Sequence, residues 1–177
     1  LRLSRGLGDV YKRQHHQCKN NRLVDRINFM GQDYDSAIHL FPAIDPYDSG
    51  YFERDNHEIY YEQVGNPYGK VILFLHGGPG AGCSPAHRRL FDPTKFRVIF
   101  IDQRGSGRSK PYGSTSNNTT QHLMSDINYL RQSLKIDKWA LFGGSWGSTL
   151  ALAYAIENPT FVTALILRGV FLGSAFE

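Results

Sequence analysis

The sequence predicts an α/β fold built on a mostly parallel sheet flanked by helices. Two continuous apolar runs of strand length, at 71–77 and 97–105, are typical of strands covered on both faces. Helical spacing follows at 119–135, and a short apolar run at 138–144 precedes an alanine-rich helical stretch that ends near Pro159. Because strands and helices alternate along the chain, we expect right-handed crossovers and parallel pairing.

The segment before the first apolar run predicts an antiparallel hairpin. Residues 49–67, "SGYFERDNHEIYYEQVGNP", hold two stretches rich in Tyr, Phe, Ile and Val. Asp55 and Asn56 stand between these stretches and favour a turn. After the next strand, residues 84–91 ("SPAHRRLF") can supply a crossover helix.

The segment 119–135 predicts an amphipathic helix, because its leucine and isoleucine residues are spaced by four, three and four positions. These residues are Leu123, Ile127, Leu130 and Leu134. Asn117 and Asn118 each begin an N-x-[ST] triplet, and we expect them to start this helix rather than to carry glycans. A further strand is expected at 162–169, "VTALILRG".

Composition indicates one globular domain after a basic leader. The chain has 177 residues, of which 41% are hydrophobic, enough for one ordinary core. Residues 1–29 hold seven Lys or Arg and two acidic residues, so the formal charge of +4 arises entirely there. This stretch lacks the apolar core of a secretory signal and resembles translated adaptor sequence near its start. We therefore assign 1–29 as a non-domain leader and 30–177 as the domain, and expect no nucleic-acid partner. A basic arm for nucleic acid or an organelle address is the alternative for the leader.

Cysteine and histidine content predicts neither a disulfide framework nor a metal site. Only Cys18 and Cys83 occur, which favours a reducing, cytoplasmic location. His15 and His16 stand near Cys18, but no second ligand pair accompanies them. No apolar run approaches the roughly 18 residues of a membrane span, so no membrane partner is expected.

Ser145 stands in the pattern G-x-S-x-G, formed with Gly143 and Gly147. An apolar strand precedes this serine and a helical pattern follows it, which is the context that a nucleophile elbow requires. Glycines two residues to either side let the strand and the helix approach closely. The start of the helix also directs backbone amides to the place where an oxyanion would form. A glycine-rich turn whose serine only caps the helix is the structural alternative.

A second glycine-rich segment, "HGGPGAG" at 76–82, follows the first apolar run. Its amides would lie at the carboxyl ends of the strands, where ligands bind in open α/β sheets. Because acyl transfer needs donors for the tetrahedral intermediate, we assign the amides of Gly78 and Trp146 as the oxyanion hole. A tight loop without a ligand is the alternative.

Nucleotide binding is disfavoured by two mismatches. Residues 77–84 follow the phosphate-loop pattern except that Cys83 stands where lysine is required. Residues 105–110 begin as G-x-G, but Lys110 occupies the third glycine position of a dinucleotide fingerprint. We therefore expect no bound nucleotide.

Several motifs in order resemble the proline iminopeptidases of the α/β-hydrolase superfamily. They are "PYDSGYF", "YYEQVGNP", "HGGPGAGCSP", "DQRGSGRS", "NTT", "FGGSWGSTLALAYA" and "LILRGVF". The resemblance covers about residues 41–173 and implies a serine peptidase that releases N-terminal proline from peptides, without metal or cofactor. Ser145 would be the nucleophile, with Trp146 and Gly78 as oxyanion donors. The resemblance gives no oligomeric state.

The same resemblance implies lesser roles for four polar residues. Asp102, Gln103 and Arg104 would shape the floor of the site. For these and for Arg168, structural hydrogen bonding and substrate contact both remain open.

The expected triad is incomplete in this sequence. In the family order, an acid and then a histidine follow the serine. All seven histidines precede Ser145, and Glu157 and Glu177 are the only carboxylate side chains after it. The resemblance therefore implies an α/β-hydrolase core truncated after about its sixth strand, without the cap domain and inactive alone. A non-catalytic binding module on the same scaffold, or an esterase or amidase, remains the alternative.

Overall fold

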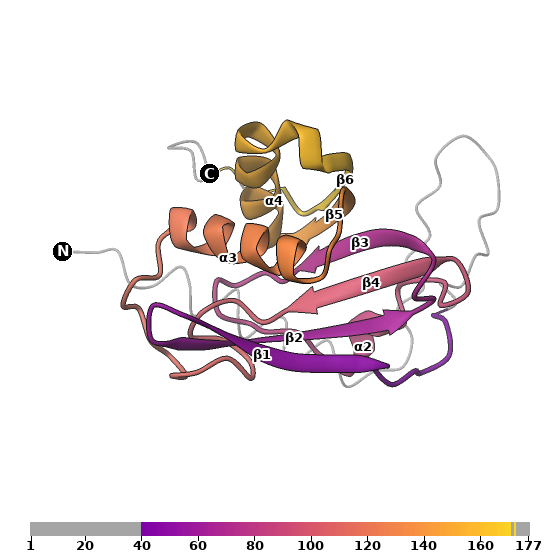
Figure 1. Ribbon diagram of the computed structural model, residues 1–177, viewed down its shortest axis with the longest axis horizontal. Coiled ribbons are helices and arrows are strands. Elements are labelled where there is room, and N and C mark those ends of the chain that lie inside the picture. The colour runs from indigo at the N-terminus through magenta and orange to yellow at the C-terminus, as the bar shows by residue number, and fades with distance from the viewer. Residues whose placement is uncertain (1–39, 171, 173–177) are drawn as a thin grey trace, which may run out of the picture. The chain divides into compact units, whose positions relative to one another are not determined.

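The computed structural model describes residues 40–170 and residue 172, in which one sheet carries helices on its two faces (Figure 1). The predicted leader at 1–29 and the cluster of His15, His16 and Cys18 lie outside these residues.

Six strands form the sheet in the order β1-β2-β4-β3-β5-β6. Their bounds are β1 Asp48–Arg54, β2 His57–Gly65, β3 Lys70–Leu75, β4 Phe96–Ile101, β5 Trp139–Gly144 and β6 Val162–Arg168. The last four in chain order, β3 to β6, pair in parallel, whereas β1 and β2 are antiparallel to their neighbours. The predicted mostly parallel sheet is confirmed.

The predicted hairpin joins β1 to β2 by a two-residue turn. Asp55 and Asn56 have φ angles of 48° and 63°. Two successive residues with positive φ form the turn type whose twist matches a hairpin, and Asp and Asn tolerate that conformation best among residues with side chains.

The helices agree with the expected positions, with two differences. Their bounds are α2 Pro85–Arg88, α3 Thr120–Ser133 and α4 Trp146–Glu157, followed by the 3₁₀ turn η1 Pro159–Phe161. The crossover helix α2 has only four residues. The expectation that Asn117 and Asn118 start α3 was wrong, because Thr119 caps it with His122 in a capping box. Asn118 instead donates to the carbonyls of Arg104 and Ser114.

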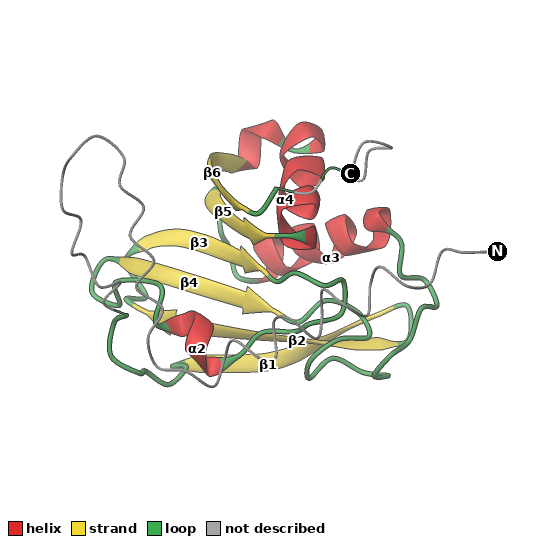
Figure 2. Ribbon diagram, turned by 180° about the vertical axis from the view of Figure 1, so that it is seen from behind, coloured by secondary structure: helices red, strands yellow, loops and turns green. Residues whose placement is uncertain are grey.

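Apolar side chains cover both faces of the sheet, as the continuous runs predicted. Helices also lie on both faces (Figures 1 and 2). Leu73, Ile99 and Leu141 lie side by side on the face that α3 and α4 cover. Phe74 and Phe100 belong to the opposite face, where α2 lies. This alternation follows from the two-residue period of a strand.

The register of the parallel strands brings the loops that follow them together at the carboxyl ends of the strands. Leu75 pairs with Ile101 on one side and with Gly143 on the other. The chain therefore leaves β3, β4 and β5 at nearly the same level, and the three following loops meet there.

Candidate active site

Ser145 lies in the turn between β5 and α4, with φ 53° and ψ −122°. This backbone conformation is unfavourable for a residue with a side chain, and such strain is found where neighbouring structure enforces it. The Ser145 amide donates to the carbonyl of Arg168 at 2.9 Å, which ties the turn to β6. The residue is exposed, and its Oγ makes no hydrogen bond to any residue that the structure describes.

The two motif glycines are required by close approach of the backbone. A Cβ on Gly143 would lie 2.3 Å from the carbonyl oxygen of Gly147, and a Cβ on Gly147 would lie 2.1 Å from that of Leu75. Both distances are far below van der Waals contact. The first turn of α4 can therefore rest directly on β5 and on the end of β3.

The glycine-rich loop after β3 runs beside the serine. A Cβ on Gly77 would lie 3.2 Å from the Cβ of Ser145. Gly78 has φ 121°, and a Cβ there would lie 2.6 Å from the amide nitrogen of Gly80. Gly78 is exposed, and its amide donates to no carbonyl in the part of the chain that the structure describes.

Trp146 is the first residue of α4, so its amide has no partner within the helix. None of the described carbonyls outside the helix accepts from it either. Neither proposed oxyanion donor is thus used by the fold. The Trp146 indole is held separately, since its Nε1 donates to Oε1 of Gln103 at 3.0 Å.

A cleft of about 350 Å³ opens beside Ser145. The end of β3, the glycine-rich loop, α2, the elbow and the end of β6 contribute to its lining. Ser145, Gly77 and Arg168 lie on its walls, whereas Gly78 and Trp146 are not among the lining residues. Arg168 is exposed there, so both of its possible roles remain open.

His76 is a structural residue in this arrangement. Its Nε2 accepts from the amide of Gln103 at 3.0 Å, which leaves the proton on Nδ1, 2.9 Å from the carbonyl oxygen of Gly77. Burial holds its pKa below the usual value, so the ring is neutral. Because both ring nitrogens are occupied, His76 has no free nitrogen to accept the Ser145 proton.

His87 is a second histidine on the cleft wall, which the sequence analysis did not single out. Its Nδ1 accepts from the amide of Ser84 at 3.1 Å, and its ring packs on Phe74 with centroids 4.8 Å apart. Burial and the charge of Arg168 hold its pKa below the usual value. Among the described residues, neither cleft histidine forms a hydrogen bond with Ser145.

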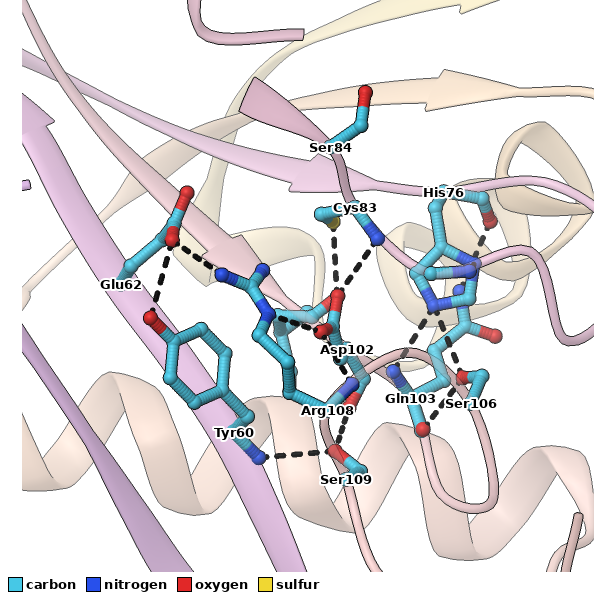
Figure 3. A network of polar contacts seen from close by, with 12 residues as sticks. Tyr60, Glu62, His76, Cys83, Ser84, Asp102, Gln103, Ser106, Arg108 and Ser109 are labelled. Atoms are coloured by element: carbon cyan, nitrogen blue, oxygen red, sulfur yellow. Dashed lines mark hydrogen bonds and ion pairs between the residues drawn. The ribbon is translucent and has the colours of Figure 1, made fainter. Parts of the chain in front are cut away.

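Asp102 connects the loop after β3 to the loop after β4 (Figure 3). Its Oδ1 accepts from the amide of Cys83 at 2.7 Å, and its Oδ2 accepts from the amide and Nε of Arg108 at 2.9 and 2.8 Å. Burial raises the pKa of Asp102, but these hydrogen bonds outweigh it and the net shift is downward. A Cβ on Gly107 would lie 2.4 Å from Asp102 Oδ2. Gly107, one of the two glycines that begin the dinucleotide-like pattern, therefore packs against a carboxylate, whereas a Cβ on Gly105 would meet the Ser114 backbone.

Glu62 on β2 completes a buried ionic network that the sequence analysis missed. It accepts from Arg88 Nε at 2.8 Å and from Arg108 Nη1 at 2.7 Å. The Arg108 guanidinium also lies over the Tyr60 ring, 3.8 Å from its centroid. These partners are 26 and 46 residues from Glu62 in sequence, so no local pattern could have shown them.

Arg104 is fully buried and serves the fold rather than the cleft. It forms two hydrogen bonds of 2.6 Å with the carboxylate of Asp126 and one of 2.8 Å with Asp55. It thereby joins the loop after β4 to α3 and to the hairpin turn. The structural interpretation of Arg104 is the one that this geometry favours.

The α/β hydrolase fold family matches residues 70–177, which is more than half of the chain. The chain belongs to the α/β-hydrolase fold family. Within that family, a strained serine between strand and helix is the usual place for the nucleophile.

Several curated relatives of this chain are more than half identical to it over the matched residues. A proline iminopeptidase of Xylella fastidiosa is 53% identical over 139 residues, which is 78% of this chain and 44% of that protein. A proline iminopeptidase of Arabidopsis thaliana is 52% identical over 134 residues, 75% of this chain and 35% of that protein. The chain spans less than half the length of the curated relatives it matches.

Solved structures share the fold of this chain. A proline iminopeptidase-related protein of Thermus thermophilus is 33% identical, with a TM-score of 0.59 over 68% of this chain and 43% of that chain. A mutant epoxide hydrolase of Vigna radiata is 27% identical, with a TM-score of 0.61 over 71% of this chain and 39% of that chain.

Two kinds of feature are absent from the part of the chain that the structure describes. Among residues 40–170 and 172, no three His, Cys, Asp or Glu side chains are grouped so that they could hold a metal ion. In the same residues, no helix has the length and apolar character needed to cross a membrane.

Proposed function

We propose that this chain supplies the nucleophile and the oxyanion donors of a serine aminopeptidase that releases N-terminal proline from peptides. The observation that carries this proposal is the exposed Ser145, held at a strained elbow on a cleft. The curated relatives at 52–56% identity support the substrate, since those proteins are named proline iminopeptidases. Fold alone would not decide it, because an epoxide hydrolase shares the fold.

In the proposed reaction, Ser145 Oγ attacks the carbonyl carbon of the N-terminal proline. The amides of Gly78 and Trp146 stabilise the negative charge on the carbonyl oxygen in the tetrahedral intermediate. The C–N bond then breaks, the shortened peptide leaves as an amine that takes up a proton, and water hydrolyses the prolyl ester on Ser145. These steps need a base that accepts the serine proton.

The base and its orienting acid are proposed to lie outside the described residues. Both ring nitrogens of His76 are engaged, and Nδ1 of His87 accepts from a backbone amide. In the order Ser, acid, His that this fold uses, the base follows the serine, and no histidine follows Ser145 in the sequence, so we infer that the 177-residue chain alone does not turn over substrate.

A chimera tests the proposal on this chain's own residues. The 139 matched residues would replace their counterparts in the Xylella fastidiosa relative, which keeps the rest of that protein. We expect the chimera to cleave prolyl p-nitroanilide, Ser145→Ala in the chimera to abolish cleavage, and the 177-residue chain to release no p-nitroaniline.

Each failure has a distinct meaning. A folded chimera that cleaves p-nitrophenyl acetate but not the prolyl substrate would favour an esterase. A folded chimera without either activity would favour a non-catalytic module. Turnover by the 177-residue chain that Ser145→Ala removes would contradict its inferred inactivity.

A further inference from the structure

We propose that Gln103 is a positioning residue that fixes the two oxyanion donors relative to each other. The proposal rests on the acyl-transfer function above and adds a role for a residue that does not touch the reacting atoms. Gln103 follows β4, whereas Gly78 follows β3 and Trp146 follows β5. In the sheet β4 lies next to β3, and β3 lies next to β5, so the Gln103 side chain reaches past the end of β3 to contact both donor segments.

Three hydrogen bonds join Gln103 to both of those segments. Its amide donates to His76 Nε2 at 3.0 Å, and its side-chain Nε2 donates to the His76 carbonyl at 2.9 Å. Its Oε1 accepts from the Trp146 indole at 3.0 Å. His76 is two residues before Gly78, and Trp146 itself provides the second donor, so each bond acts within two residues of a donor.

The geometry of Gln103 permits one orientation only. Its side-chain nitrogen donates to a carbonyl and its side-chain oxygen accepts from an N–H. A flipped side chain would place its oxygen against the carbonyl oxygen and its NH₂ group against the N–H, so both hydrogen bonds would be lost. The residue is 5% exposed, which makes that loss costly. Ser106 Oγ donates to the Gln103 carbonyl at 2.6 Å and holds its backbone as well (Figure 3).

This arrangement matters for rate because oxyanion donors act through preorganisation. A displacement of about 1 Å at the reacting centre can cost a factor of about 100 in rate. Hydrogen bonds that hold the donors should therefore affect kcat rather than substrate binding.

The test uses the complete open reading frame that encodes this chain, with prolyl p-nitroanilide and p-nitrophenyl acetate as substrates. Gln103→Met removes both side-chain bonds, and Trp146→Phe removes the indole donor but keeps the backbone amide. Gln121→Met makes the same change at an exposed position of α3 and serves as the matched control. Rates are normalised to active serines counted by a fluorophosphonate probe, which removes the effect of misfolded protein.

We expect Gln103→Met to lower kcat roughly tenfold to a hundredfold for both substrates with KM within about twofold. Trp146→Phe should lower kcat less, and should add little in the Gln103→Met background because the shared bond is already lost. Gln121→Met should match the wild type.

Unchanged kcat per active serine in Gln103→Met, or multiplicative losses in the double variant, would overturn the proposal. An effect seen on the ester while the wild type leaves the prolyl substrate intact would support Gln103 and reject the peptidase function. A wild type without either activity would overturn both.

Discussion

The space around the backbone near Ser145 determines which positions must be glycine. Gly144 and Gly147 both lie in the G-x-S-x-G turn, but a Cβ on Gly144 would meet no atom within 4 Å, whereas one on Gly147 would lie 2.1 Å from a backbone oxygen. The backbone therefore has room for a side chain at Gly144 but not at Gly147.

Gly147→Ala should destabilise the protein by about 1–3 kcal/mol, because the backbone of β3 or α4 must move to admit the methyl group. Gly144→Ala, the matched control, should stay within about 1 kcal/mol of the wild type. Urea unfolding followed by circular dichroism measures both. Equal losses in the two variants would show that the close approach to Leu75 does not limit packing.

The charge of Glu62 should make the stability of the protein depend on pH in the acidic range. Burial raises its pKa, but hydrogen bonds from Arg88 and Arg108 outweigh burial and hold the pKa below its usual value. A carboxyl with a lowered pKa contributes stability that is complete above its unfolded pKa and is lost as the pH falls through the folded pKa. Its contribution should therefore persist at neutral pH and be lost progressively as the pH falls below about 4, the usual pKa range of a glutamate carboxyl.

Glu62→Gln should lower the free energy of unfolding by about 1–3 kcal/mol at pH 7, because a neutral amide replaces the carboxylate that accepts hydrogen bonds from two arginines. The difference from wild type should shrink as the pH is lowered from 5 to 3. Unfolding free energies across that range test this, with the exposed Glu53→Gln as control. A difference that stays constant with pH would contradict the assigned role of the Glu62 charge.

At the level of elements, β6 stands out because it is an exposed edge. Among the described residues it pairs only with β5, and Leu165 and Ile166 are 38% and 44% exposed. An exposed apolar edge strand is prone to pair with another chain.

Ile166→Lys should reduce self-association of the 177-residue chain, because a charge on an edge strand opposes intermolecular pairing. Ile156→Lys makes the same change on α4, at a side chain that is 78% exposed, and is the control. Light scattering coupled to size-exclusion chromatography gives the mass distribution. An equal effect of both variants would indicate general hydrophobic association instead.

Elements were predictable where local patterns determine them. Apolar runs identified β3, β4 and β5, the spacing of Leu123, Ile127 and Leu130 identified α3, and two turn residues identified the hairpin. The start of α3 was missed because a Thr119 cap and an asparagine cap look alike in sequence. Only the fold shows that Asn118 is bonded to Arg104 instead.

For the whole molecule, the sequence located the serine and its glycine loops but could not show what holds them together. The bonds of Gln103, Asp102 and Glu62 join segments far apart in the chain, and their pairing depends on strand order and register. The assignments of Ser145, Gly78 and Trp146 to catalysis, and of the chain to the cytoplasm, stay predictions.

Removing the leader, residues 1–29, should leave the stability of the domain unchanged. A chain that begins at Met30 lacks the basic stretch 1–29, which we assigned outside the domain. Its unfolding free energy in urea should match that of the full chain within about 0.5 kcal/mol, as for changes away from packed structure. A loss of more than about 1 kcal/mol would show that the leader belongs to the domain.

The parallel strands bring the loops after β3, β4 and β5 together at their carboxyl ends, away from the connections at their amino ends. The connection at 66–69 enters β3 at its amino end, and Tyr68 there is 97% exposed. Exposed connections of this kind accept inserted sequence most readily. A fluorescent reporter or an affinity tag placed at 66–69 would therefore mark the protein without reaching its cleft.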